Sequence, residues 1–218
     1  MVRLSAHRSG YDPRVSEPQA VADRAEEFLP GAWHWSVADE RIGGFVSSSH
    51  AFLDESGLVL VDPLPLARDA EEPLGKVLAI CLTTSGHQRS AWRLRRELGV
   101  HVWAPANVRE VEEEPDERYS EGDVLPGGSR AIFMPGPGTA QHGLLLERGG
   151  GVLFTSDLFV HPAGSELRFV PGEYMHDPEQ ARRTAEGLLD LDFAVLCTGH
   201  GAPMTDDPKA AIRSALAA

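Results

Sequence analysis

The stretch AICLTTSGHQRSAWRL, residues 79–94, decides the fold that this sequence predicts. It begins inside an apolar run, KVLAICL (76–82), which is typical of a strand covered on both faces. A polar turn follows, and residues 88–98 then place Ala91, Leu94 and Leu98 on one face of a helix that Gly99 ends. A buried strand that leads through a polar turn into an amphipathic helix indicates an α/β protein.

The segments on either side repeat this alternation. Residues 17–29 are expected to form a short helix before the Pro30-Gly31 break. The predicted strands are 33–38, 43–52, 57–61, 76–82 and 100–103 in the first half, and 129–134, 141–147, 151–156 and 193–197 in the second. The predicted helices of the second half are 178–191 and 208–217. This order favours two similar halves packed sheet to sheet, with helices outside.

The composition excludes several classes of function. Hydrophobic residues make up 42% and charged residues 24% of 218 residues, which is enough for a sizeable core. A net charge of -13 argues against binding nucleic acid or anionic membranes. The sequence has no apolar run of the roughly twenty residues that a membrane helix needs, and we expect no secretory signal. Cys81 and Cys197 lie in apolar runs and are read as buried reduced thiols, so we expect a cytoplasmic protein.

Four segments in this order resemble the metallo-β-lactamase superfamily: GLVLVDP (57–63), AICLTTSGHQRSAWRL (79–94), MPGPGTAQHGLLLERGGGVLFTSDLF (134–159) and VLCTGHGAP (195–203). The resemblance implies a four-layer αββα sandwich with the active site at one edge, between the two sheets. It implies one such domain over residues 31–218, with residues 1–30 as an N-terminal extension that serves as a lid, an arm or a disordered tail. In that family, histidine and aspartate side chains hold one or two zinc or iron ions that activate a water molecule.

Most of the family's ligand positions carry other residues here. With Thr83 as the motif threonine, only Asp157 and His200 match the family's ligands. The residues at the other ligand positions are Thr84, Gly86, Gln88, Arg89 and Pro137. These are poor or impossible ligands for zinc. A register shifted by one residue places His87 on a histidine position but leaves Ser85, Arg89 and Ser90 at the others.

The sequence therefore predicts a protein that lacks the dinuclear site. The leading hypothesis is a protein that holds no metal and binds a small anionic metabolite or acts without a metal. The alternative is a hydrolase of an ester, thioester or lactone, with one zinc or iron ion on His87, Asp157 and His200. A third reading, a purely structural module, expects the cleft to be filled by side chains such as Phe159 or Trp92. In the preferred register His87 is expected to face solvent or to cap the helix.

Arg89 carries a further hypothesis. Its guanidinium, at a former ligand position, is expected to take the place of the metal charge and to pair with Asp157, and to favour an anionic ligand. His142 is either a general base or a half-exposed structural residue. The candidate pocket residues are Thr84, His87, Gln88, Arg89, Gln141, His142, Asp157 and His200. The expected partner is a small molecule, with no nucleic acid and no membrane, and the prediction allows for a homodimer.

Overall fold

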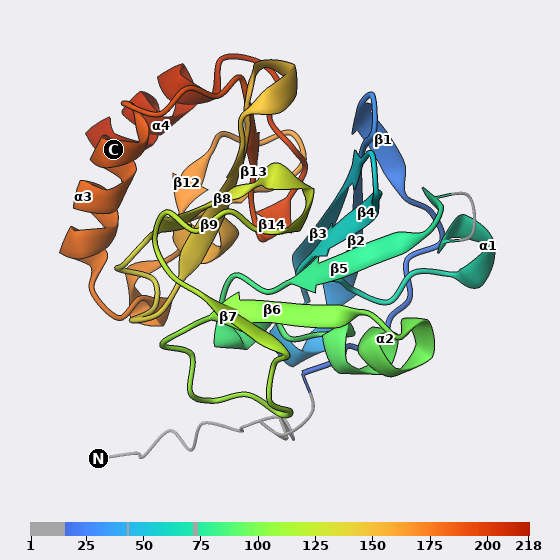
Figure 1. Ribbon diagram of the computed structural model, residues 1–218. Coiled ribbons are helices and arrows are strands. Elements are labelled where there is room, and N and C mark those ends of the chain that lie inside the picture. Colours follow the sequence, from blue (N-terminus) through green and yellow to red (C-terminus); the bar gives the residue numbers. More distant parts are fainter. Residues whose placement is uncertain (1–15, 43, 72–73) are drawn as a thin grey trace, which may run out of the picture.

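A computed structural model describes residues 16–42, 44–71 and 74–218 (Figure 1). The first sheet has seven strands in chain order: β1 (Glu26–Leu29), β2 (Ala32–Asp39), β3 (Phe45–Asp54), β4 (Gly57–Val61), β5 (Val77–Cys81), β6 (His101–Pro105) and β7 (Glu117–Tyr119). Strands β1 to β4 are antiparallel neighbours, and β4 to β7 run parallel to one another. Strand β5 lies in the continuous apolar run 76–82, as predicted, whereas β7 was not among the predicted strands.

The second half forms two smaller sheets. A four-stranded sheet has the order β13 (Val195–Cys197), β10 (Val152–Phe154), β9 (His142–Leu146) and β8 (Arg130–Phe133). A three-stranded sheet has the order β12 (Arg168–Phe169), β11 (Phe159–His161) and β14 (His200–Gly201). The helices are α1 (Arg68–Glu71), α2 (Ala91–Leu98), α3 (Pro178–Leu188) and α4 (Pro208–Ala217).

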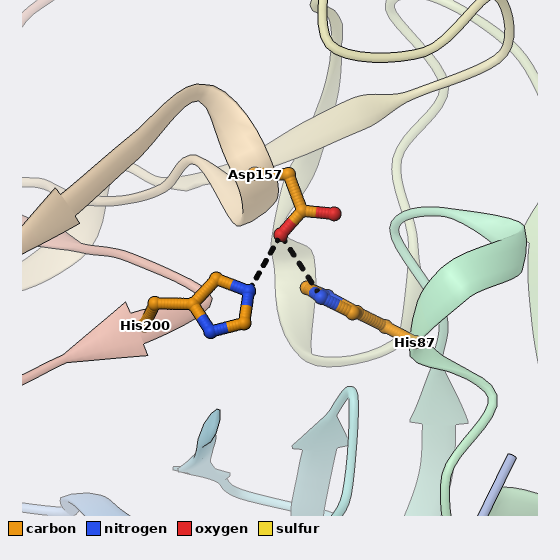
Figure 2. Close-up of side chains that lie close together, drawn as sticks. All are labelled: His87, Asp157 and His200. Carbon is orange, nitrogen blue, oxygen red and sulfur yellow. Dashed lines mark hydrogen bonds and ion pairs between the residues drawn. The ribbon is translucent and has the colours of Figure 1, made fainter. Parts of the chain in front are cut away.

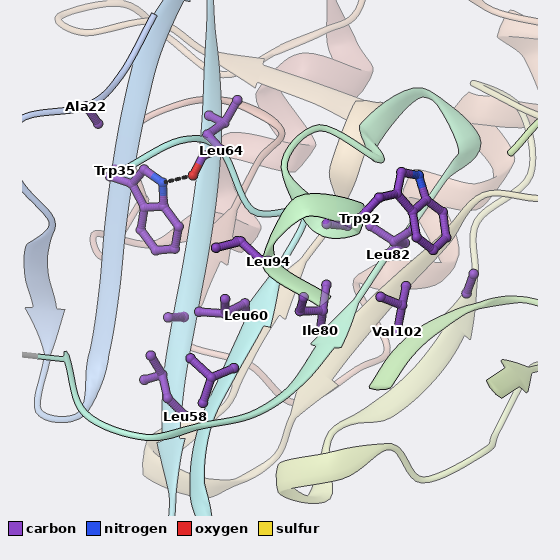
Figure 3. Close-up of a cluster of buried hydrophobic side chains, with 14 of the residues drawn as sticks. Ala22, Trp35, Leu58, Leu60, Leu64, Ile80, Leu82, Trp92, Leu94 and Val102 are labelled. Carbon is purple, nitrogen blue, oxygen red and sulfur yellow. Dashed lines mark hydrogen bonds between the residues drawn. The ribbon is translucent and has the colours of Figure 1, made fainter. Parts of the chain in front are cut away.

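Three groups of buried apolar side chains hold the layers together. Trp35, Leu60 and Ile80 of the first sheet pack against Trp92 and Leu94 of α2 (Figure 3). A second group, which includes Phe52 and Phe154, joins the two sheets. A third packs the second sheet against α3 and α4, which lie together on the outer side of the molecule (Figure 1). The layers are therefore helix, sheet, sheet and helix, which confirms the predicted αββα sandwich.

The segment before β2 is the main error of the sequence-based assignment. The helix expected over 17–29 is wrong, because residues 26–29 are the strand β1, which pairs with β2 across the Pro30-Gly31 turn. Strand pairing with a neighbour outweighs local helix propensity here. No helix among the described residues is long and apolar enough to span a membrane.

The topology brings four strand ends to one edge of the sandwich. Asp62 follows β4 and Thr83 follows the neighbouring parallel strand β5. In the second sheet, Asp157 follows β10, and the turn that leads to His200 follows the parallel strand β13. Carboxyl ends of parallel strands meet at the same edge, so both halves of the chain present polar groups there.

Candidate metal centre

His87, Asp157 and His200 meet at this edge (Figure 2). Asp157 Oδ1 lies 3.0 Å from His87 Nε2 and 3.1 Å from His200 Nε2. One donor atom from each residue lies within 4.8 Å of the other two. The side chain of His87 is 6% exposed, and those of His200 and Asp157 are 18% and 28% exposed. The expectation that His87 faces solvent or caps the helix is wrong, because its ring is buried against Asp157.

The second nitrogen of His87 has a fixed acceptor. His87 Nδ1 lies 3.0 Å from Asp62 Oδ2 and 3.2 Å from Ser156 Oγ. Asp62 is itself held by Thr83, whose backbone N–H and hydroxyl donate to its two oxygens at 2.8 and 2.5 Å. Because a carboxylate only accepts, this arrangement favours a proton on Nδ1 and leaves Nε2 as the lone pair that faces Asp157.

His200 is held in the same way by the backbone. His200 Nδ1 lies 2.8 Å from the carbonyl oxygen of Val46. A carbonyl only accepts, so Nδ1 is the donor and Nε2 again faces Asp157. With neutral rings, two nitrogen lone pairs and one carboxylate oxygen would converge on one small volume. Such a cluster requires positive charge between its members, supplied by protons or by a metal ion.

The pKa shifts agree with that requirement. Burial raises the pKa of Asp157, but the charge of His87 and the hydrogen bond from His200 outweigh it and hold the pKa well below its ordinary value. Burial and the charge of Arg89 lower the pKa of His87, but Asp157 and the hydrogen bond to Asp62 outweigh them and raise it. Without a metal, both shifts favour the charged forms of His87 and Asp157.

Backbone strain is concentrated around the cluster. Asp62, Arg89 and Ser156 have positive φ angles of 49°, 45° and 50°. A non-glycine residue in this region costs about 1 kcal/mol or more, and such residues gather at functional sites. Each of the three adjoins or supports a member of the cluster.

A glycine allows the close packing of the histidine ring. A Cβ atom added at Gly199 would lie 2.6 Å from His87 Cε1 and 3.2 Å from Asp157 Oδ1. Real Cβ atoms do not approach that closely, so the TGHG sequence needs its first glycine for the ring of His87 to occupy its place.

Arg89 does not pair with Asp157, as the sequence had suggested. Its side chain is buried, with the residue 3% exposed, and it donates to the carbonyl oxygens of Ser48 (2.5 Å), Asp62 (3.1 Å) and Gly199 (3.4 Å). Among the described residues, the basic side chains that contact the carboxylate of Asp157 are those of the two histidines. The predicted ion pair is therefore wrong.

Gln88 serves as a brace behind the cluster. Its amide nitrogen donates to the carbonyls of Ser85 and Glu110, and its oxygen accepts from Trp92 Nε1 and the backbone N–H of Glu112.

The acidic segment 110–118 is also held by arginines of α2. Arg95 contacts Asp116 at 2.6 Å, and Arg96 pairs with Glu113. Two acidic residues of this segment, Glu113 and Asp116, are thus paired with arginines of the helix.

The remaining predicted pocket residues point elsewhere. Gln141 Nε2 donates to the carbonyl of Thr155 at 3.4 Å. The ring of His142 packs edge-on against Tyr119, with Nδ1 3.0 Å from the carbonyl oxygen of Ala140, and burial lowers its pKa. Thr84 is half-buried and precedes the 3-10 turn Ser85–His87 without capping it. Trp92 and Phe159 pack in the two outer helix–sheet cores.

A large concavity lies away from the cluster. It has a volume of about 1140 Å³ and is lined by residues at the amino ends of β5 and β6, among them Lys76, Val77 and His101. It shares no lining residue with the cluster.

The outer partners Asp62, Thr83, Val46 and Ser156 were not among the predicted site residues. Asp62 nevertheless ends a strand within one of the four segments that resemble the superfamily.

The comparison with protein-family models gives a match over residues 28–213 to the model described as the metallo-β-lactamase superfamily. The chain belongs to this superfamily. No functionally curated protein matches it by sequence.

Solved structures of this superfamily share the fold. The metallo-β-lactamase DIM-1 is 16% identical, with 91% of this chain and 96% of that chain covered and a TM-score of 0.73. A metallo-β-lactamase from Pontibacter korlensis is 15% identical, with 89% and 98% covered and a TM-score of 0.71. One from Hirschia baltica is 12% identical, with 91% and 97% covered and a TM-score of 0.66. At these identities the likeness establishes the superfamily's fold.

Proposed function

We propose that this superfamily member is a mononuclear metallohydrolase that holds one zinc or iron ion on His87 Nε2, Asp157 and His200 Nε2. The observation that carries the proposal is the direction of the two rings. Each has Nδ1 on a fixed acceptor and Nε2 on the same carboxylate oxygen. This is the arrangement of metal-binding histidines, whose outer nitrogen is held by a carboxylate or a backbone carbonyl. It favours the alternative of the sequence analysis over the metal-free hypothesis.

The donor set suits one ion with open positions. Two imidazoles and one carboxylate bind catalytic zinc in hydrolases and iron in other enzymes. When bound, such an ion polarises a carbonyl and lowers the pKa of its water. The residues at the family's other ligand positions support a single ion. Thr84, Gly86 and Pro137 offer no strong donor, and the side-chain amide of Gln88 is already hydrogen-bonded to other groups of the protein.

The protein's own residues have distinct tasks in this proposal. Asp62 keeps the proton of His87 on Nδ1, and Thr83 keeps Asp62 in place. Gly199 gives the ring of His87 its room. Asp157, with 28% of its side chain exposed, is the donor on the solvent side, where a substrate would approach.

The surroundings favour a substrate with an apolar acyl group. Val46, whose carbonyl holds His200, and its neighbour Phe45 are 43% and 59% exposed, and Ile42 of the same hairpin is 39% exposed. Exposed apolar side chains on a hairpin beside the site can provide contact area for an apolar ligand. Arg89 gives no support for an anionic ligand, because its guanidinium is directed at three buried carbonyls. We therefore propose esters, thioesters or lactones with apolar acyl groups.

Metal analysis tests the proposal. Protein purified without chelator should carry one equivalent of zinc or iron, or bind one equivalent of zinc after dialysis, and should hydrolyse members of an ester, thioester and lactone panel. His87→Ala, Asp157→Ala and His200→Ala should each abolish tight binding and hydrolysis. His101→Ala is the matched control, because this histidine is 65% exposed at the start of β6. A folded wild type that binds no metal would favour the metal-free hypothesis, and two equivalents would contradict a single site.

A further inference from the structure

Arg89 joins three separate segments of the chain behind the metal cluster. Nη1 donates to the carbonyls of Ser48 and Asp62, and Nη2 donates to that of Gly199. These residues belong to β3, to the end of β4 and to the turn between β13 and β14. The backbone of Arg89 lies in the left-handed region, at φ 45°, where glycine or asparagine would be less strained. The side-chain contacts thus maintain a backbone conformation that arginine does not favour.

Each joined segment holds part of the cluster. Asp62 is the outer partner of His87. Gly199 precedes His200 and lies against the ring of His87. The Ser48 backbone N–H donates to the carbonyl of Gly199 at 2.8 Å, and its hydroxyl bonds both the N–H and the carbonyl of Gly201 at 2.9 and 2.8 Å. The β3 segment thereby fixes the residues on both sides of His200.

We propose that Arg89 is a positioning residue for the metal donors, an inference that rests on the proposed metal site. A guanidinium has five donors in a rigid fork and a permanent charge, so one side chain can hold three carbonyls in a fixed arrangement. By joining Ser48, Asp62 and Gly199, it sets the spacing between the segment that orients His87 and the segment that carries His200. Arg89 itself touches neither donor nitrogen.

The fork predicts a graded response to substitution. In Arg89→Lys, one ammonium can replace Nη1 at Ser48 and Asp62 but cannot also replace Nη2 at Gly199, so the His200 side should loosen first. In Arg89→Met, all three contacts are lost. Removal of an outer partner lowers metal affinity about 10- to 100-fold. Arg89 acts one contact further out, through the carbonyls of Asp62 and Gly199, so we expect Arg89→Met to lower zinc affinity about 10-fold and Arg89→Lys to lower it less.

Amide hydrogen exchange in the metal-free protein provides a readout that does not require zinc. The amides of Ser48 and Gly201, which bond across the β3–β14 contact, should exchange faster in both variants. The amide of Thr155, which bonds the carbonyl of Cys197 at 2.8 Å in the second sheet, reports the stability of the fold as a whole. A purely structural role would change all three amides together.

Arg118→Met is the matched control. Arg118 also donates to three carbonyls, those of Pro105, Ala106 and Val108, but does so beside β6 and β7, and its removal should leave zinc affinity unchanged. The inference is overturned if the amides of Ser48 and Gly201 keep their exchange rates in Arg89→Lys, or if zinc affinity is retained in Arg89→Met. If the latter does not fold, Arg89→Lys decides. If the wild type binds no zinc, the metal proposal fails, while the exchange rates still decide the role of Arg89.

Discussion

Zinc binding should release protons, and the protonation of His87 sets the minimum number released. The pKa of His87 is raised above 6.5, because Asp157 and the hydrogen bond to Asp62 outweigh burial and the charge of Arg89. At pH 6.5 this ring is therefore more than half protonated in the metal-free protein. A metal ion needs the Nε2 lone pair, so binding must displace more than half a proton from His87 alone.

The number of protons released determines the direction and the slope of the pH dependence of zinc affinity. The logarithm of the binding constant rises with pH by the number of protons released per pH unit. A release of at least half a proton means that zinc affinity grows about threefold or more per pH unit near pH 6.5. The affinity falls towards acid because the protonated ring of His87 and the metal compete for the same nitrogen.

Isothermal titration calorimetry can count these protons. Zinc is titrated at pH 6.5 into the metal-free protein in two buffers with different ionisation enthalpies, and the difference between the observed enthalpies gives the number released. The Asp62→Asn variant serves as a comparison, because it removes the carboxylate that helps to raise the pKa of His87. Zinc binding that releases less than half a proton, or an affinity independent of pH between 5.5 and 7, would refute the assignment of His87 Nε2 as a donor.

Three further predictions concern other parts of the site and the core. Asp62→Asn should lower zinc affinity about 10- to 100-fold with an unchanged circular dichroism spectrum. The reason is that an NH2 group of asparagine facing His87 Nδ1 cannot accept the proton of that nitrogen. Asp54→Asn is the control. Gly199→Ala should weaken zinc binding measured by competition with a chelator, because its Cβ would lie 2.6 Å from His87 Cε1, whereas Gly187→Ala meets nothing within 4 Å. Burial lowers the pKa of His34 to about 4, so the unfolded chain binds the extra proton below pH 6.5 and stability falls with acid. Between pH 6.5 and 4, denaturant titrations should show that the wild type loses about 3 kcal/mol more than His34→Gln; equal losses would contradict this.

Most of the fold could be predicted from the sequence, because the strands between Trp33 and Trp103 and the helix after Asp177 have clear periodicity or caps. The strands β7, β11, β12 and β14 were not predicted, because two or three residues are too few to show a period. The β1 strand was missed because its structure depends on pairing with β2 rather than on local propensity. Asp157 and His200 were identified as remaining donors because they stand at matched motif positions.

The place of His87 could not be read from the sequence. Two registers of the motif gave opposite directions for its ring, and the correct one depends on the left-handed backbone of Arg89 and on the close approach of Gly199. The hydrogen-bond acceptors of Arg89 could not be predicted either, because they are backbone carbonyls, which every residue type has. Contacts with the backbone of distant segments decided both outcomes.

The three donors come from different halves of the sandwich: His87 from the first, and Asp157 and His200 from the second. An ion held by all three would be a non-covalent cross-link between the halves and would favour only chains whose two sheets are docked. At a free zinc concentration one hundred times the dissociation constant, such a link would add about 2.7 kcal/mol to the free energy of unfolding. The availability of zinc would then determine the stability of the protein as well as its activity.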